Sequence, residues 1–178
     1  VHDEGPTIAL IYGVGTIHRG HSEYDPLGQS GSMGSTTVAA SLRAATRDDD
    51  VVAILFRVNS PGGSYVASDV IWREVSRACE MGIPVVVSMG DVAGSGGYFV
   101  AAPASQIVAH PGTITGSIGV VSFGINLSGL MEKLGVANQT ITSGAYKDAG
   151  SPLRPLSKAE RAQLQSVVDD IYTRFVEV

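Results

Sequence analysis

Buried strands alternate with helices through the middle of this 178-residue chain, and this order constrains the fold more than any other feature. Residues 51–58 form an apolar, β-branched run interrupted only by Arg57, which is typical of a strand covered on both faces. Residues 64–81 place apolar side chains at helical spacing, and residues 84–89 form a second short buried strand. Small residues from 96 to 102 predict a tightly packed helix. The alternation predicts an α/β layered domain.

Further elements are expected on both sides of this core. A buried first strand is predicted within residues 7–17 and a helix within residues 36–46. Residues 19–35 between them are rich in Gly and Ser and show no periodicity, so we expect a mobile loop. After the core, short strands are predicted within residues 106–125 and at 139–142, with a short helix at 127–134 between them.

The last element is a helix that begins at a capping box formed by Ser157 and Glu160. Its apolar face stays in phase to the last residue, with no Gly, Pro or basic turn to end it. The length of 178 residues is that of one domain, so we expect residues 1–178 to be a single domain, and the unfinished helix predicts that they are a fragment of a longer protein.

Composition excludes several classes of function. The net charge is -5 and the basic residues form no stripe, so nucleic acid is not an expected partner. Cys79 is the only cysteine, which rules out an intramolecular disulfide, and no ligand spacing resembles a zinc site. No metal or cofactor is expected. Residues 92–131 contain no charged side chain, but their many Gly, Ser and Thr residues and two Pro residues predict short strands and turns rather than membrane helices.

Ser95 is the candidate nucleophile. It lies in the sequence Gly94-Ser95-Gly96-Gly97, between a buried strand and a helix of small residues. A hydroxyl in this place gains from helix N-terminal N–H groups, and the N–H of the next residue, Gly96, could donate to an oxyanion. A plain tight turn built from small residues is the alternative reading.

A second turn, Pro61-Gly62-Gly63, also ends a buried strand. In α/β sheets the crevice beyond the strand ends is where ligands bind, so this turn could supply a second oxyanion donor. The alternative is an ordinary Pro-Gly turn.

The residues alone leave the general base open. A triad that uses His110 and Asp91 is possible, although nothing in the sequence fixes their geometry. A lysine with a depressed pKa is the other option, and Lys147, which follows a predicted strand, is the candidate that does not lie on a predicted helix.

Four motifs resemble the signal peptide peptidase A (SppA) family: residues 57–64, 88–98, 115–119 and 143–147. The resemblance covers about residues 7–178 and implies a Clp protease/crotonase-like fold of repeated ββα units. It also implies a serine endopeptidase with a Ser/Lys dyad.

The resemblance also assigns roles to individual residues. By position it implies Ser95 as nucleophile and Lys147 as base, with Ser117 hydrogen-bonded to the lysine. The oxyanion hole would be formed by the N–H groups of Gly63 and Gly96.

The resemblance carries further expectations about the full-length protein. The substrates would be remnant signal peptides, bound as extended strands. The single-repeat form implies a homo-oligomer, an octamer, with active sites shared between protomers. The resemblance also implies an N-terminal membrane anchor and a C-terminal extension, which residues 1–178 would lack, so the full-length protein would be membrane-anchored, with its catalytic domain on the extracytoplasmic side. Two alternatives share the fold: a crotonase-type acyl-CoA enzyme, which needs no serine nucleophile, and a non-catalytic scaffold.

Overall fold

The computed structural model describes residues 5–25 and 30–178, and it contains two compact units. Unit 1 consists of Val1–Gly119 together with Phe175–Val178, and unit 2 is Val120–Arg174. That residues 1–178 act as one peptidase domain stays a prediction.

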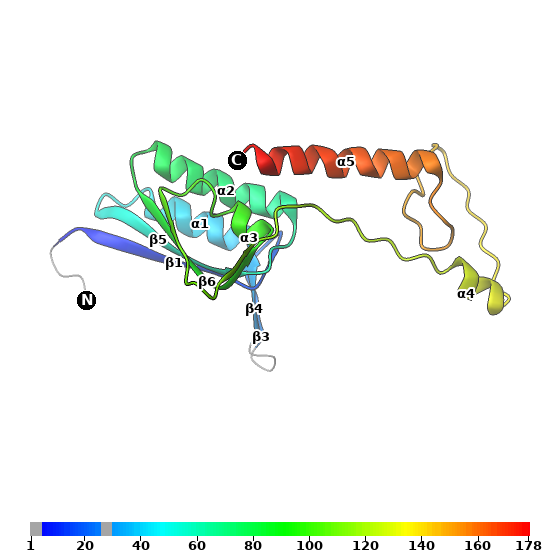
Figure 1. Cartoon of the computed structure of the whole chain (residues 1–178), viewed down its shortest axis with the longest axis horizontal. Helices are drawn as coiled ribbons and strands as arrows, with labels where there is room; N and C mark the ends of the chain where they lie inside the picture. The colour runs from blue at the N-terminus through cyan, green and yellow to red at the C-terminus, as the bar shows by residue number, and fades with distance from the viewer. Residues whose placement is uncertain (1–4, 26–29) are drawn as a thin grey trace. The chain divides into compact units, whose positions relative to one another are not determined.

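Unit 1 is built on a parallel β-sheet (Figure 1). Its strands are β1 (Thr7–Val14), β5 (Val51–Ser60), β6 (Val85–Gly94) and β7 (Gln106–Val108), hydrogen-bonded in that order. A further strand, β8 (Ile114–Gly116), pairs in parallel with the last residues of β6. Helices connect β1 to β5 and β5 to β6, as parallel crossovers require. The predicted α/β class is confirmed.

Helices α1 (Ser35–Ala45) and α2 (Tyr65–Glu80) contact each other and pack against the sheet (Figure 1). Alternate residues of β5 point into this layer, so that Ile54, Phe56 and Val58 are buried, as expected for a period-two strand. The helices supply apolar side chains at helical spacing from the other side of the core: Val38, Leu42, Ile71, Val75 and Ala78.

Helix α2 begins where the sequence predicts. The side chain of Ser64 caps it by accepting a hydrogen bond from the N–H of Ala67. Gly82 follows its last turn with a φ of 82°, a conformation that favours glycine. Both ends of the predicted helix are therefore confirmed to within one residue.

The predicted irregular segment at residues 19–35 is partly wrong. Its described part contains β3 (Tyr24–Asp25) and β4 (Ser30–Gly34), whereas residues 26–29 lie outside the described residues. Strand β4 pairs with β3 and also with β2 (Thr16–His18), a short strand that follows β1. Backbone pairing holds these strands without an apolar repeat, which is why periodicity did not reveal them.

Unit 2 contains α4 (Ser128–Lys133) and most of α5 (Lys158–Val176), and both helices were predicted. The strand predicted at residues 139–142, and any strand after β8 within residues 117–125, are not found in the described chain. Apolar residues alternate at Val121, Phe123 and Ile125, but a strand also needs a neighbouring strand to pair with. Among the described residues, no helix has the length and apolar character needed to cross a bilayer.

Candidate active site

Ser95 occupies a sharp turn between β6 and α3 (Gly96–Phe99). Its φ of 49° and ψ of -120° lie in a region that residues other than glycine rarely adopt. The N–H of Ser95 donates to the carbonyl of Gly116 at 2.8 Å, and its own carbonyl accepts from Tyr98 and Phe99. Such backbone strain costs about 1–3 kcal/mol and gathers at functional sites. A strained serine between a strand and a helix is the arrangement of a nucleophile elbow.

The turn that contains Gly63 is held by β2. The N–H of Ile17 donates to the carbonyl of Gly62, and the N–H of Ser64 donates to the carbonyl of Ile17, each at 2.8 Å. The C=O and N–H groups of one trans peptide point in opposite directions, so the N–H of Gly63, which shares a peptide with the Gly62 carbonyl, points away from Ile17.

The two turns lie against each other. A β-carbon added to Gly62 would be 2.7 Å from the nitrogen of Gly96 and 2.8 Å from the β-carbon of Ser95. A β-carbon added to Gly96 would be 3.4 Å from the nitrogen of Gly63. Within the described parts of the chain, neither the N–H of Gly63 nor that of Gly96 donates a hydrogen bond. The structure therefore brings two unused N–H donors together beside Ser95.

Ser60 and Asn59 support these turns, and sequence reasoning missed both. The buried Ser60 hydroxyl donates to the carbonyl of Gly15 at 2.6 Å and accepts from the N–H of Gly62 at 3.1 Å. The side-chain oxygen of Asn59 accepts from the N–H of Val92 at 3.1 Å. The two residues are the last two of β5 before Pro61, and polar residues at the end of a buried strand were the signal that could have found them.

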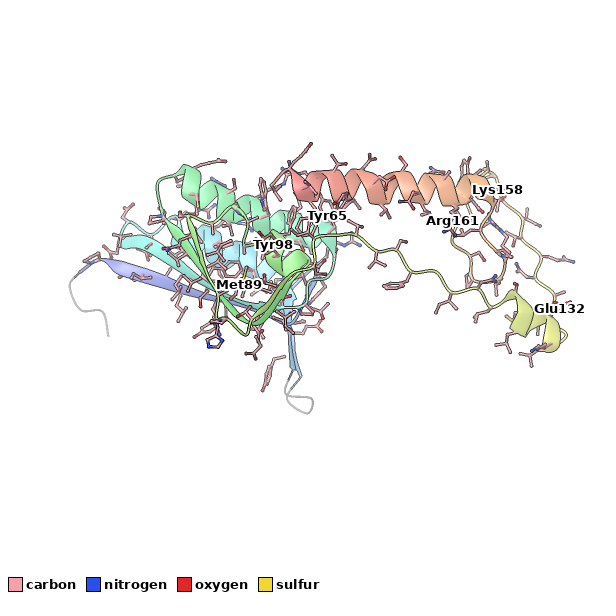
Figure 2. All side chains as sticks on the ribbon, viewed as in Figure 1. Tyr65, Met89, Tyr98, Glu132, Lys158 and Arg161 are labelled. Atoms are coloured by element: carbon pink, nitrogen blue, oxygen red, sulfur yellow. The ribbon has the colours of Figure 1, made fainter. Side chains whose placement is uncertain are left out.

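Helix α3 is fixed by aromatic packing on α2. The ring of Tyr65 meets the ring of Phe99 edge-on, with centroids 5.6 Å apart. Figure 2 shows Tyr65 at the start of α2 and Tyr98 on α3. This packing holds the first residue of α3, Gly96, beside the Gly62–Gly63 turn.

Ser117 lies near the Ser95 turn. It follows β8, whose residue Gly116 accepts the hydrogen bond from Ser95, and its φ is 51°. Its β-carbon would be 3.7 Å from a β-carbon added to Gly94. Ser95 and Ser117 are the two residues other than glycine with positive φ in the part of the chain that the structure describes.

Lys147 belongs to unit 2 and is exposed. It lies in a series of turns, where its N–H donates to the carbonyl of Gly144 at 3.2 Å. Its pairing with Ser95 and with Ser117 stays a prediction. Residues 5–25 and 30–178 contain no group of three or more His, Cys, Asp or Glu side chains that could hold a metal ion.

The alternative base, His110, is not arranged for a triad with Asp91. Its Nδ1 atom accepts a hydrogen bond from the N–H of Gly112 at 3.0 Å, and no hydrogen bond joins it to Asp91 in the described chain. Both side chains line a pocket beside Arg57, whose guanidinium donates to the Ser88 hydroxyl at 2.8 Å. The geometry therefore gives no support to a His/Asp mechanism.

The model of peptidase family S49 matches residues 77–178, which is more than half of the chain. The chain belongs to peptidase family S49. This membership confirms the resemblance predicted from the four motifs and the serine-peptidase class.

Relatives with protease names extend the match over most of the chain. Protease 4 of Salmonella typhi is 40% identical over 98% of this chain and 27% of its own length. A putative signal peptide peptidase SppA of Enterococcus faecium is 42% identical over 77% of this chain and 40% of its own length. Serine protease SPPA, chloroplastic, of Arabidopsis thaliana is 41% identical over 88% of this chain and 23% of its own length. The chain thus spans less than half the length of each.

A solved structure is also similar. It is a mutant of a membrane-bound stomatin-specific protease in complex with a substrate peptide. The TM-score is 0.49 and the identity 20%, over 69% of this chain and 49% of that chain.

Proposed function

We propose that this chain is the catalytic part of a signal peptide peptidase that uses Ser95 as nucleophile and Lys147 as general base. The observation that carries the proposal is the strained turn at Ser95, with the unused N–H groups of Gly63 and Gly96 beside it. Membership of family S49 and the relatives named as proteases support it. Lys147 is assigned as the base because residues 143–147 resemble a motif of the family.

The reaction is an acyl transfer in two steps. The neutral amine of Lys147 takes the hydroxyl proton of Ser95, and the serine oxygen attacks the peptide carbonyl carbon. The N–H groups of Gly63 and Gly96 donate to the negative oxygen of the tetrahedral intermediate. As the peptide bond breaks, the lysine ammonium returns the proton to the leaving amine. Water then attacks the ester while Lys147 takes one of its protons. When the ester bond breaks, the acid leaves and the lysine ammonium returns the proton to the Ser95 oxygen.

Ser117 has a supporting role in this mechanism. Its hydroxyl accepts a hydrogen bond from the Lys147 amine and orients it. A Ser117→Ala change is therefore expected to slow turnover less than loss of either Ser95 or Lys147.

The wider setting of the proposal concerns the full-length protein. Its substrates are remnant signal peptides, and it is anchored in the membrane with the catalytic domain on the extracytoplasmic side. It assembles as an octamer in which Ser95 and Lys147 come from neighbouring protomers. Mixing Ser95→Ala protein with Lys147→Ala protein, after confirmed subunit exchange, is then expected to restore activity, and no recovery would contradict the shared site.

The decisive experiment combines an activated-serine probe with peptide hydrolysis. The probe is expected to label the parent protein at Ser95, and Ser95→Ala is expected to abolish both labelling and hydrolysis. Ser76→Ala on α2 is the control, because the Ser76 hydroxyl donates its hydrogen bond to the exposed carboxylate of Glu80. Acyl-CoA turnover that survives Ser95→Ala would instead favour the crotonase-type reaction.

The base is tested with matched lysine variants. Lys147→Ala is expected to abolish hydrolysis, whereas Lys133→Ala, which removes an exposed lysine from the last turn of α4, is expected to leave it unchanged. Full hydrolysis by Lys147→Ala would overturn the assignment.

A further inference from the structure

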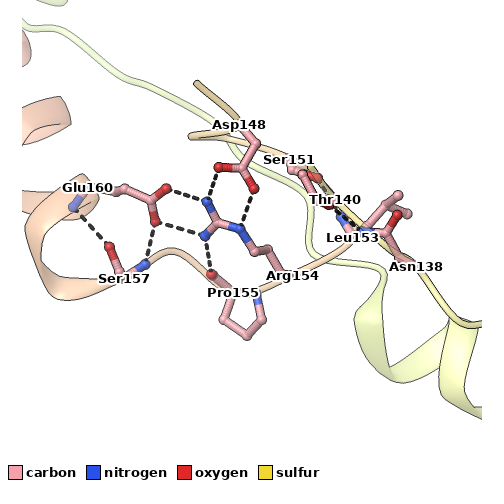
Figure 3. A network of polar contacts seen from close by, with 9 residues as sticks. All are labelled: Asn138, Thr140, Asp148, Ser151, Leu153, Arg154, Pro155, Ser157 and Glu160. Atoms are coloured by element: carbon pink, nitrogen blue, oxygen red, sulfur yellow. Dashed lines mark hydrogen bonds and ion pairs between the residues drawn. The ribbon is translucent and has the colours of Figure 1, made fainter. Parts of the chain in front are cut away.

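Arg154 joins two carboxylates of unit 2 through paired hydrogen bonds (Figure 3). Its Nε and Nη2 atoms donate to the two oxygens of Asp148, each at 2.8 Å. Its Nη1 atom donates to one oxygen of Glu160 at 2.9 Å, and Nη2 also donates to the other. The planar guanidinium suits this geometry, because it presents its donors in a rigid fork.

Glu160 anchors one end of this network to the start of α5. Its carboxylate accepts from the N–H of Ser157 at 2.7 Å, and its own N–H donates to the Ser157 hydroxyl at 3.2 Å, which confirms the predicted capping box. The side chain is 3% exposed. Hydrogen bonds from Arg154 and from the Ser157 backbone lower the pKa of Glu160 from its ordinary 4.5 to about 2. The carboxylate therefore stays charged and fixed.

Asp148, at the other end of the network, directly follows Lys147 in the chain. Between α4 and α5 the described chain forms no helix or strand, and the backbone around Lys147 follows a series of turns. The N–H of Lys147 donates to Gly144, and the N–H of Ser151 donates to Asp148. The hydrogen bonds of Arg154 link these turns to the start of α5 through Asp148 and Glu160.

The orientation of Asp148 also matters for charge. Both of its oxygens are occupied by Arg154, whose hydrogen bonds are the main cause of its lowered pKa. The carboxylate thus faces the guanidinium.

We propose that Arg154 is a positioning residue for Lys147, because it clamps the turn that carries Lys147 to the start of α5 through Asp148 and Glu160. The inference rests on the proposed function of Lys147 as the base. Arg154 itself touches neither substrate nor nucleophile. Its effect reaches the reaction through the place and orientation of the lysine amine.

The test measures kcat and KM separately for hydrolysis of a fluorogenic peptide with small apolar side chains. Arg154→Gln is expected to lower kcat about 10- to 100-fold, because small misplacements of a reacting group have effects of this size. KM is expected to stay near the parent value. Arg73→Gln is the matched control, since Arg73 forms an exposed ion pair with Asp69 on α2 and should leave both constants unchanged.

Two further variants keep the test decisive if Arg154→Gln fails to fold. Arg154→Lys keeps the charge but cannot bridge both carboxylates, and Asp148→Asn keeps the shape but removes the charge that Arg154 holds. Both are expected to lower kcat, with Arg154→Lys partly restoring what Arg154→Gln loses. In the double variant, Asp148→Asn should lower kcat little beyond the loss caused by Arg154→Gln, because both changes break the same link.

The outcomes separate this inference from the proposed function. If Arg154→Lys and Asp148→Asn keep the parent kcat while Lys147→Ala is inactive, the role of Arg154 is overturned and the proposed function stands. An active Lys147→Ala would overturn the proposed function. An equal rise in KM and fall in kcat/KM, with kcat unchanged, would also overturn the inference, because it would place Arg154 in substrate binding.

Discussion

A Gly62→Ala change tests whether the Gly62–Gly63 turn and the Ser95 turn form one site. Gly62 has a φ of 101°, and its added β-carbon would lie 2.7 Å from the Gly96 nitrogen and 2.9 Å from the Gly94 carbonyl oxygen. Both contacts are shorter than real β-carbons make, and both involve backbone atoms. One of the two turns must therefore shift.

The size of the effect follows from two contributions. Positive φ alone costs an alanine about 1–2 kcal/mol of stability. Overpacking against backbone adds about 1–3 kcal/mol. Gly82→Ala separates the two, because Gly82 has a φ of 82° and no atom within 4 Å of its added β-carbon. We therefore expect Gly62→Ala to lower the free energy of unfolding by about 2–5 kcal/mol and Gly82→Ala by about 1–2 kcal/mol.

Activity should distinguish the variants more sharply than stability. Displacement of the Gly96 N–H in Gly62→Ala is expected to lower kcat about 100- to 1,000-fold, the usual effect of losing one oxyanion donor. Gly82→Ala should keep the parent kcat. Thermal and denaturant unfolding, with peptide hydrolysis at a temperature where both variants are folded, provide the measurements. Equal losses of stability in the two variants, with parent activity in Gly62→Ala, would refute the packing of the two turns.

Two further predictions concern buried polar groups. Ser60→Ala should lower the free energy of unfolding by about 1–3 kcal/mol, because the Gly15 carbonyl and the Gly62 N–H both lose their hydrogen bond to the Ser60 hydroxyl. Denaturant unfolding measures this change, with Ser76→Ala as the control. For Glu160, a carbon-detected NMR titration should give a midpoint of about 2, against an ordinary value of 4.5. The lowered pKa means that its contribution to stability is complete above pH 4.5 and is lost as the pH falls through about 2. In Arg154→Gln the titration midpoint of Glu160 should rise toward 4.5, and an unchanged midpoint would show that Arg154 is not the cause of the lowered pKa.

The sequence determined the local elements of this protein. The continuous apolar run in residues 51–58 and the helical period in residues 64–81 are local signals, so β5 and α2 were predicted almost to their ends. The Ser157 and Glu160 capping box was also visible, because its partners lie three residues apart. Such signals need no distant contact.

Tertiary structure decided how the turns meet. The positive φ of Ser95 depends on its hydrogen bond to Gly116, and the direction of the Gly63 N–H depends on pairing with Ile17. Both partners are far away in the sequence, and no periodicity or motif spacing encodes a backbone direction across such a distance. The link from Arg154 to Asp148 was likewise not predictable, because the chain has several carboxylates that could pair with a guanidinium and only the fold determines which one lies beside it. The residue types of the site could therefore be read from the sequence, whereas the geometry that makes them a site required the packed chain.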